Sequence, residues 1–315
     1  MGQNPGGGLR GALHAGYFAK DASFTPRLYT SSALTVKLKK MRSSTDNDAS
    51  QKELEDELMD VGKRLLKLPS STDEILTLLE EAEGILYGVW QELARHKASA
   101  LYPLMKALIT DELLRHTDIN IQVAVASCFN EITRLTAPTF PYNDDQMKEI
   151  FQLFMVALKQ LSSESGNNYV RALQILEALA KARSCLIMLD IEIDAMIVEM
   201  FQLFFNIIRS NYCSDVFQYM ETIMTMIIEE SNEVSLELLR PLLDSVRLDN
   251  KNISPISWEL GKTVFDKCMT KLRPYLKEAV KALNLKVDEY AEIVAILCQD
   301  TSNGQNMVRP STCIS

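Results

Sequence analysis

Residues that make tight turns are scarce in this chain. Its 315 residues include only 12 glycines and 10 prolines, both below their usual share. β-sandwiches and turn-rich barrels need many such turns, and no run of alternating Val, Ile or Thr lies between turn residues. We therefore expect an all-α protein of roughly 10 to 12 helices.

Motifs for metal binding and nucleophilic catalysis are also missing. The six cysteines form no Cys-x-x-Cys pair, and there are only three histidines, so zinc-site spacing is absent. No phosphate loop, H-E-x-x-H or G-x-S-x-G motif occurs. We expect a non-enzyme without metal or cofactor, with cysteines packed in the core of a reducing compartment. His96 and His116 are expected at helix ends, near free carbonyls; a shared nucleophile or metal role is the alternative.

The charges argue against two classes of partner. The most apolar stretch, residues 184–208, contains four acidic residues, which a membrane-spanning helix would not tolerate. The net charge is −9, whereas binding a nucleic-acid backbone needs excess Lys and Arg. A local basic patch around Arg240 and Arg247 remains open.

The first fifty residues differ from the rest. Residues 1–42 contain seven basic residues and one acid, leaving 26 basic and 41 acidic residues, a net charge of −15, for the remainder. This composition fits a transit peptide, a disordered tail, or translated sequence upstream of a start at Met41. Residues 37–40 could serve nuclear import or be a solvated charge run. We predict a disordered basic leader over 1–50 and a disordered tail over 300–315.

Apolar stripes with helical spacing fill residues 51–299. Ser71 and Glu74 match a capping box, and Asp144 with Asp145 can cap a later helix. Several acids near the first cap are expected at a helix N-terminus and on a solvated face: Asp73, Glu74, Glu80, Glu81 and Glu83. Methionines and phenylalanines at helical spacing are expected to form core, with a partner groove as the alternative: Met196, Met200, Phe201, Phe204, Phe205, Met220, Met224 and Met226.

The helices recur with a period. First helices of successive pairs begin near residues 98, 144, 193 and 235, and second helices near 118, 169, 216 and 258. Steps of about 40 to 50 residues are typical of HEAT and armadillo repeats. Asp118 closes one inter-helix turn before a run of small residues. We predict a HEAT/armadillo-like α-solenoid over 51–299, which offers an extended interaction surface; an unrelated helical bundle is the alternative.

One connection stands out, because residues 136–142 place Pro138 and Pro141 beside Phe140 and Tyr142. Prolines stiffen a chain and extend the residue before each of them. The loop could therefore present a docking site to a partner peptide. The plainer interpretation is that Pro138 stops a helix and Phe140 plugs the repeat junction.

Several long strings resemble a known family. They are residues 104–116, 123–128, 131–138, 142–152, 183–190, 197–201, 220–224 and 238–246. Over about residues 53–295 the chain is similar to the amino-terminal HEAT region of the cohesin-associated Pds ("precocious dissociation of sisters") family, especially its plant members.

The resemblance implies a non-enzymatic nuclear scaffold that regulates cohesin in sister-chromatid cohesion, chromosome segregation and DNA repair. It implies contacts with the kleisin subunit, the release factor and the acetyltransferase of cohesin, and with chromatin only indirectly. No membrane or small-molecule partner is expected. The alternative is a cytosolic HEAT-type adaptor. Because the family is much longer, we also expect a truncated isoform or an incomplete gene product.

The same resemblance points to the loop. The family has an Ala-Pro-acidic-Ala-Pro loop that receives a short Tyr-Ser-Arg motif. It corresponds here to Ala137, Pro138, Thr139, Phe140 and Pro141, followed by Tyr142. Thr139 replaces the acid and Phe140 replaces the second alanine, so the natural partner for the arginine of such a motif is missing.

Overall fold

The described part of the chain is helical. The computed structural model describes residues 47–89, 98–137, 140–163, 165–209 and 214–298. These contain 15 α-helices, three short 3-10 helices and no β-strand. Three of the α-helices have only four residues each, so the number of longer helices agrees with the prediction. The all-α class is confirmed.

The chain divides into two compact units, one ending at Glu230 and the other beginning at Ser231. The first unit contains α3 (Asn47–Leu65), α4 (Thr72–Gly88), α6 (Ala98–Leu108), α7 (Asp111–Leu114), α8 (Ile119–Thr136), α9 (Asp144–Leu158), η1 (Lys159–Ser162), α10 (Asn167–Lys181), η2 (Ser184–Leu186), α11 (Ile187–Asp190), α12 (Asp194–Ile207) and α13 (Ser214–Glu230).

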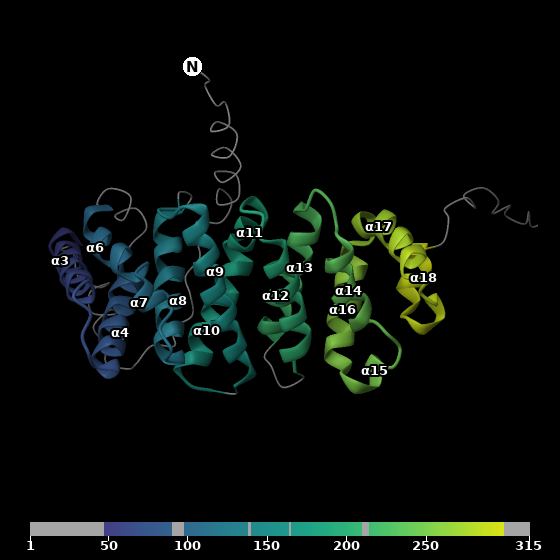
Figure 1. Ribbon diagram of the computed structural model, residues 1–315, viewed down its shortest axis with the longest axis horizontal. Helices are drawn as coiled ribbons and strands as arrows, with labels where there is room; N and C mark the ends of the chain where they lie inside the picture. The colour runs from purple at the N-terminus through teal and green to yellow at the C-terminus, as the bar shows by residue number, and fades with distance from the viewer. Residues whose placement is uncertain (1–46, 90–97, 138–139, 164, 210–213, 299–315) are drawn as a thin grey trace, which may run out of the picture. The chain divides into compact units, whose positions relative to one another are not determined.

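The helices of the first unit pack as successive layers of a repeat. Helices α4, α8, α10 and α13 contact one another in that order, α3 packs on α6, and α9 lies against both α8 and α10 (Figure 1). Within this unit the observed helix starts at 98, 144 and 194, and at 119, 167 and 214, differ from the predicted starts by no more than two residues. The repeat period is therefore a property of the fold.

Helix α8 is the centre of the first unit. Twelve of its residues are buried, and Ala124 and Ala126 are fully inaccessible. Small side chains let neighbouring helices approach closely, which explains how α8 contacts both α4 and α10. The small-residue run after Asp118 thus marks a helix surrounded by others.

The second unit corrects one predicted boundary. It contains α14 (Leu236–Ser245), α15 (Asn250–Ile253), α16 (Pro255–Lys267), α17 (Met269–Ala282), η3 (Val287–Glu289) and α18 (Glu292–Cys298). The helix expected to begin near 258 and to continue to Leu272 along its apolar stripe instead runs from Pro255 to Lys267, because the chain breaks at Cys268. The buried positions Leu260, Val264, Cys268 and Leu272 keep a spacing of four across this break. The spacing of apolar residues therefore does not predict the helix break at Cys268.

The helix caps also differ from the expectations. Ser71 occupies the N-cap position of α4, but its side chain makes no capping hydrogen bond. The capping box of α9 is formed by Asn143 and Gln146, one residue before the predicted Asp144. Asp118 does cap α8, accepting a hydrogen bond from the Asn120 N–H at 2.7 Å.

Most of the predicted core residues are buried. Cys128, Cys185 and Cys268 are buried free thiols, and Cys298 is half-buried. Buried members of the Met and Phe group are Met200, Phe201, Phe204, Met220 and Met224, while Met196, Phe205 and Met226 are half-buried. No helix in the described ranges has the length and apolarity needed to cross a membrane. Residues 1–46 and 299–315, which include most of the predicted leader and the tail, lie outside the described residues.

Candidate partner-binding loop

The loop between α8 and α9 has firm ends. Helix α8 ends with Ala137 at its C-cap, where the buried Ala137 N–H donates to the Thr133 carbonyl at 3.1 Å. At the other end, the Gln146 N–H donates to the Asn143 side chain at 2.9 Å and the Gln146 amide oxygen accepts from the Asn143 N–H at 3.1 Å. Hydrogen bonds therefore hold the chain at Ala137 and at Asn143 on the two sides of the loop.

Tyr142 anchors the loop to the helices beneath it. Its ring meets Phe129 of α8 edge-on, with centroids 5.4 Å apart and planes at 79°. Its hydroxyl donates to the Met105 carbonyl of α6 at 3.5 Å. Burial, with a smaller effect of the Cys128 thiolate, raises the pKa of Tyr142 far above its usual value, so the hydroxyl is a neutral donor. Tyr142 therefore shapes the loop by its inward contacts.

The remaining loop residues differ in exposure. Pro141 is exposed and Phe140 is half-buried, so both reach the surface in part. Pro138 and Thr139 lie outside the described residues. The structure thus brings Ala137, Phe140, Pro141 and Tyr142 together in one connection, with Ala137 and Tyr142 facing the protein.

Carboxylates lie directly after the loop. Asp144 and Asp145 occupy the first turn of α9, where negative charge interacts favourably with the helix dipole. Asp145 is exposed. Farther along α9, Glu149 pairs with Arg115 at 3.1 Å. Exposed carboxylates therefore lie in the first turn of α9, directly after the loop.

A buried ionic network ties three helices together, and the sequence analysis missed it. Arg171 of α10 forms ion pairs with Glu83 at 2.7 Å and Glu80 at 3.3 Å on α4, while Ser127 of α8 donates to Glu83. The expectation that Glu83 lies on a solvated face is therefore wrong: its side chain is 21% exposed and that of Arg171 is 7% exposed. Arg171 lies 88 residues from Glu83, so helical periodicity gives no signal for the pair.

Arg134 of α8 makes a second polar connection between α8 and α4. It pairs with Glu131 at 2.8 Å and donates to the Leu86 carbonyl of α4 at 3.0 Å. Both side chains are largely covered. Helices α4, α8 and α10 are thus connected by specific charged contacts as well as by apolar packing, which makes this part of the unit a rigid base for the loop.

The other polar residues singled out in the sequence have structural contacts. His116 lies in the turn between α7 and α8, as expected, but its ring accepts the Asp118 N–H at 3.0 Å instead of donating to a carbonyl. His96 lies outside the described residues.

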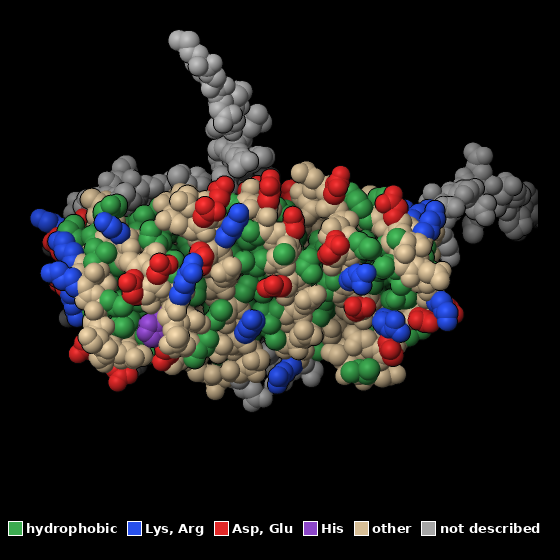
Figure 2. Space-filling model, viewed as in Figure 1, with side chains coloured by type: hydrophobic (Ala, Val, Ile, Leu, Met, Phe, Trp, Pro, Cys, Tyr) green, Lys and Arg blue, Asp and Glu red, His purple; other side chains and the backbone are tan. Residues whose placement is uncertain are grey.

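Arg247, from the basic patch that the sequence left open, pairs with Asp249 at 3.4 Å and Glu289 at 3.5 Å. Within the described ranges no group of three or more His, Cys, Asp or Glu could hold a metal. Figure 2 shows acidic and basic side chains intermixed on the face in view.

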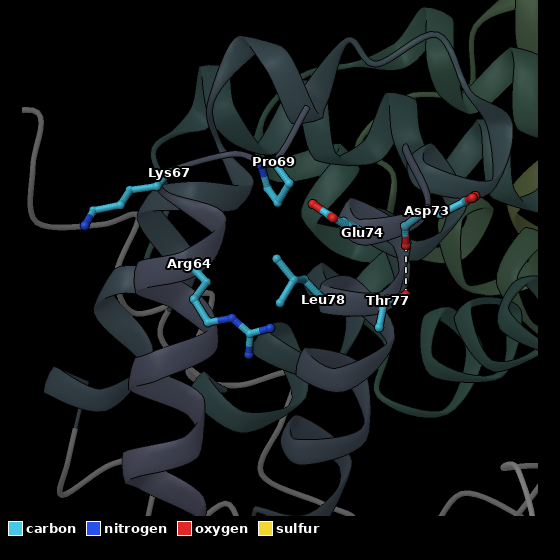
Figure 3. A pocket seen from close by; sticks show the side chains of 7 residues that line it. All are labelled: Arg64, Lys67, Pro69, Asp73, Glu74, Thr77 and Leu78. Atoms are coloured by element: carbon cyan, nitrogen blue, oxygen red, sulfur yellow. Dashed lines mark hydrogen bonds between the residues drawn. The ribbon is translucent and has the colours of Figure 1, made fainter. Parts of the chain in front are cut away.

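A pocket of about 470 Å³ lies at the junction of α3 and α4. In Figure 3, Arg64 from α3 and Glu74 and Leu78 from α4 reach toward the gap, whereas Lys67 points away from it. Arg64 is already paired with Glu81 at 3.3 Å and Asp60 at 3.7 Å, and both partners are exposed. The pocket is lined by both acidic and basic side chains, and Arg64 is already paired. The lining therefore favours no particular class of ligand.

Comparison with known proteins identifies a family. The family model for "Sister chromatid cohesion protein PDS5 protein" matches residues 73–284, which include the loop and the ionic network. The Arabidopsis thaliana sister chromatid cohesion protein PDS5 homolog C is 44% identical over 252 residues, covering 80% of this chain and 29% of that protein. Homolog E from the same plant is 42% identical over 84% of this chain and 27% of its own length. The chain thus spans less than a third of these relatives.

A solved structure is also similar. Its title is "Structure of the Pds5-Scc1 complex and implications for cohesin function", and its matching chain superposes with a TM-score of 0.58 at 25% identity, covering 67% of this chain and 33% of that chain. The helical fold and the sequence matches agree with the plant-like resemblance seen in the sequence. The chain belongs to the PDS5 family of sister chromatid cohesion proteins.

Proposed function

We propose that this chain is a non-enzymatic nuclear scaffold that regulates cohesin through protein–protein contacts. The observation that carries the proposal is the family match across residues 73–284, which favours cohesin over the cytosolic assemblies that also use such helical repeats. The proposed partners are the kleisin subunit, the release factor and the acetyltransferase, with chromatin contacted through cohesin. The proposed roles extend to mitotic and meiotic segregation and to DNA repair.

Two features of the chain support this role. A repeat of packed helices exposes a long surface that suits partner contacts. The solved relative is titled as a complex of Pds5 with Scc1, so a protein of this family has a protein partner. Because the chain covers less than a third of its plant relatives, the partners of a full-length relative extend to it only as a proposal.

Affinity purification tests the function. The tagged chain is recovered from nuclear extract, and the proteins that accompany it are identified by mass spectrometry against a tag-only control. We expect enrichment of cohesin subunits or of the release factor. Recovery of cytosolic assemblies without cohesin would contradict the proposal and favour the adaptor.

We also propose that the loop formed by Ala137, Pro138, Thr139, Phe140, Pro141 and Tyr142 receives a short partner motif of the Tyr-Ser-Arg type. Tyr142 contacts Phe129 and the Met105 carbonyl, which supports the proposal by fixing one end of the loop on the helices. The first-turn carboxylates of α9, Asp145 in particular, are placed to pair with the arginine of the motif, since the family's acid is absent at Thr139.

Titration of a peptide tests the contribution of the prolines and that of Asp145 separately. A labelled peptide containing Tyr-Ser-Arg is titrated by fluorescence anisotropy. Replacing both prolines by alanine (Pro138→Ala with Pro141→Ala) should abolish binding while the helical circular dichroism is unchanged. Asp145→Asn should weaken binding by at least threefold. The matched control is Asp56→Asn, which removes the same charge at an exposed residue of α3 in the same unit. Unchanged affinity in the double proline variant would overturn the loop assignment.

A further inference from the structure

A second surface, apart from the loop, lies on the second unit around α15 and the start of α16. Ile253 is 79% exposed, the greatest exposure of any large hydrophobic side chain in the described residues, and Leu248 is 46% exposed. Both belong to the short segment between α14 and α16. Exposed apolar side chains close together on a surface are a feature of interaction sites.

Trp258 follows these residues in the chain, in the first turns of α16. Ile253 directly precedes the N-cap Ser254 and Trp258 is the fourth residue of α16, the two positions that can form a hydrophobic staple. Ile253 is nevertheless 79% exposed, so most of its side chain is uncovered. The Trp258 Nε1 atom is buried and has no hydrogen-bond partner among the described groups. Such a buried donor costs stability, and a small rearrangement on binding would relieve it.

The ring of Trp258 is surrounded by positive charge. The Lys251 Nζ lies 5.0 Å and the Lys262 Nζ 5.9 Å from its centroid. Lys262 forms a long ion pair with Asp266, at 3.9 Å. Asp249 and Glu289 are paired with Arg247, and Glu259 is exposed on α16. The ammonium groups of Lys251 and Lys262 therefore lie near the aromatic ring. We expect both to be able to pair with a carboxylate of a bound partner.

We propose that this surface, made of Leu248, Lys251, Ile253, Trp258 and Lys262, docks an acidic peptide segment of a partner protein. An apolar side chain of the segment would cover Ile253 and the edge of Trp258, and a neighbouring carboxylate would pair with Lys251 and Lys262. A nucleic acid fits less well, since one aromatic ring and two lysines are a small fraction of a stacking groove on a chain of net charge −9. The surface is independent of the proposed loop.

A displayed library of random 16-residue peptides tests the proposal without knowledge of the natural partner. The full chain is the bait, and the double variant Lys251→Glu with Lys262→Glu is used for counter-selection. The matched control is Arg240→Glu with Lys281→Glu, which changes the net charge equally at two exposed residues of the same unit. Thermal melts of both variants check that they fold.

Peptides that survive counter-selection should be rich in Asp and Glu and contain at least one large apolar residue. One such peptide, synthesised and titrated in a Trp90→Phe background, should change the fluorescence of Trp258, the remaining tryptophan. We expect at least tenfold weaker binding to the Lys251/Lys262 variant and to Ile253→Ser, and no change in the control. Failure to obtain peptides that distinguish the variants, peptides without acidic enrichment, or tighter binding of a single-stranded oligothymidine would overturn the proposal.

Discussion

At the residue scale, the unit that ends at Glu230 depends on one buried arginine. Arg171 donates to both carboxylate oxygens of Glu83, from Nε to Oε1 at 3.2 Å and from Nη2 to Oε2 at 2.7 Å. Two parallel N–H donors on one carboxylate give the strongest geometry for such a pair. The neighbouring carboxylates raise the pKa of Arg171, against the desolvation that lowers it. The arginine therefore remains charged and bound.

Removing this guanidinium should destabilise the protein strongly. Arg171→Met leaves the Glu83 carboxylate without its guanidinium partner, although the Ser127 hydroxyl still donates to it. Breaking such a covered pair costs about 2 to 3 kcal/mol after allowing for the partial exposure of Glu83. Urea unfolding measures the change.

The matched control lies on the same helix. Lys181 pairs with Glu177 at 2.7 Å, but the lysine side chain is 48% exposed, so Lys181→Met should cost less than about 1 kcal/mol. Equal costs for the two variants would show that burial of the Arg171 pair adds nothing.

The buried thiols predict a pH dependence. Burial raises the pKa of Cys185 from 9.0 to about 12, whereas the unfolded chain has an ordinary thiol. Above about pH 9 the unfolded state therefore binds fewer protons than the folded state, and the free energy of unfolding falls as pH rises, by up to about 1.4 kcal/mol per pH unit for one group. This stabilisation is fully present below the unfolded pKa.

Urea midpoints at pH 8 and pH 10 check this expectation. The decrease between the two values should be smaller in Cys185→Ala, which no longer has the titrating thiol, even though its stability at pH 8 is lower. An identical decrease in the variant would show that this thiol contributes nothing to the dependence.

At the scale of the elements, the two caps make a paired prediction. Asn143→Ala removes the side-chain oxygen that accepts the Gln146 N–H, one of the two hydrogen bonds of the α9 capping box, and should cost about 1 kcal/mol. Ser71→Ala should have almost no effect, since the Ser71 side chain makes no capping hydrogen bond. Denaturation curves of the two variants give the comparison. A larger loss for Ser71→Ala would contradict the observed caps.

Much of the arrangement of helices could be predicted from the sequence, because apolar spacing reports which face is buried. The start of α8 was predictable from Asp118 and the buried stripe after it. The break at Cys268 was not, since its buried side chain continues the stripe. Asn143 was missed because two aspartates follow it directly.

The candidate loop was less predictable than the helices. Two prolines and two aromatics marked it in the sequence, but the inward contacts of Tyr142 join three separate segments. Periodicity describes one helix at a time, so contacts between α6, α8 and the loop cannot be obtained from it. The same limit explains why the Arg171 network was missed.

At the scale of the whole molecule, membership of the PDS5 family rests on a match over residues 73–284. The chain corresponds to 27–31% of the length of the Arabidopsis thaliana PDS5 homologs C, D and E. We propose that the helical repeats of this chain are sufficient to contact cohesin, although the chain corresponds to only part of these relatives.

Binding to purified cohesin tests that claim most directly. Intact cohesin is immobilised, the purified chain is titrated over it, and the double proline variant of the loop is run in parallel. We predict saturable binding at micromolar concentration, in low and physiological salt. Absence of binding to cohesin by a folded chain, with normal circular dichroism and a cooperative melt, would contradict the account.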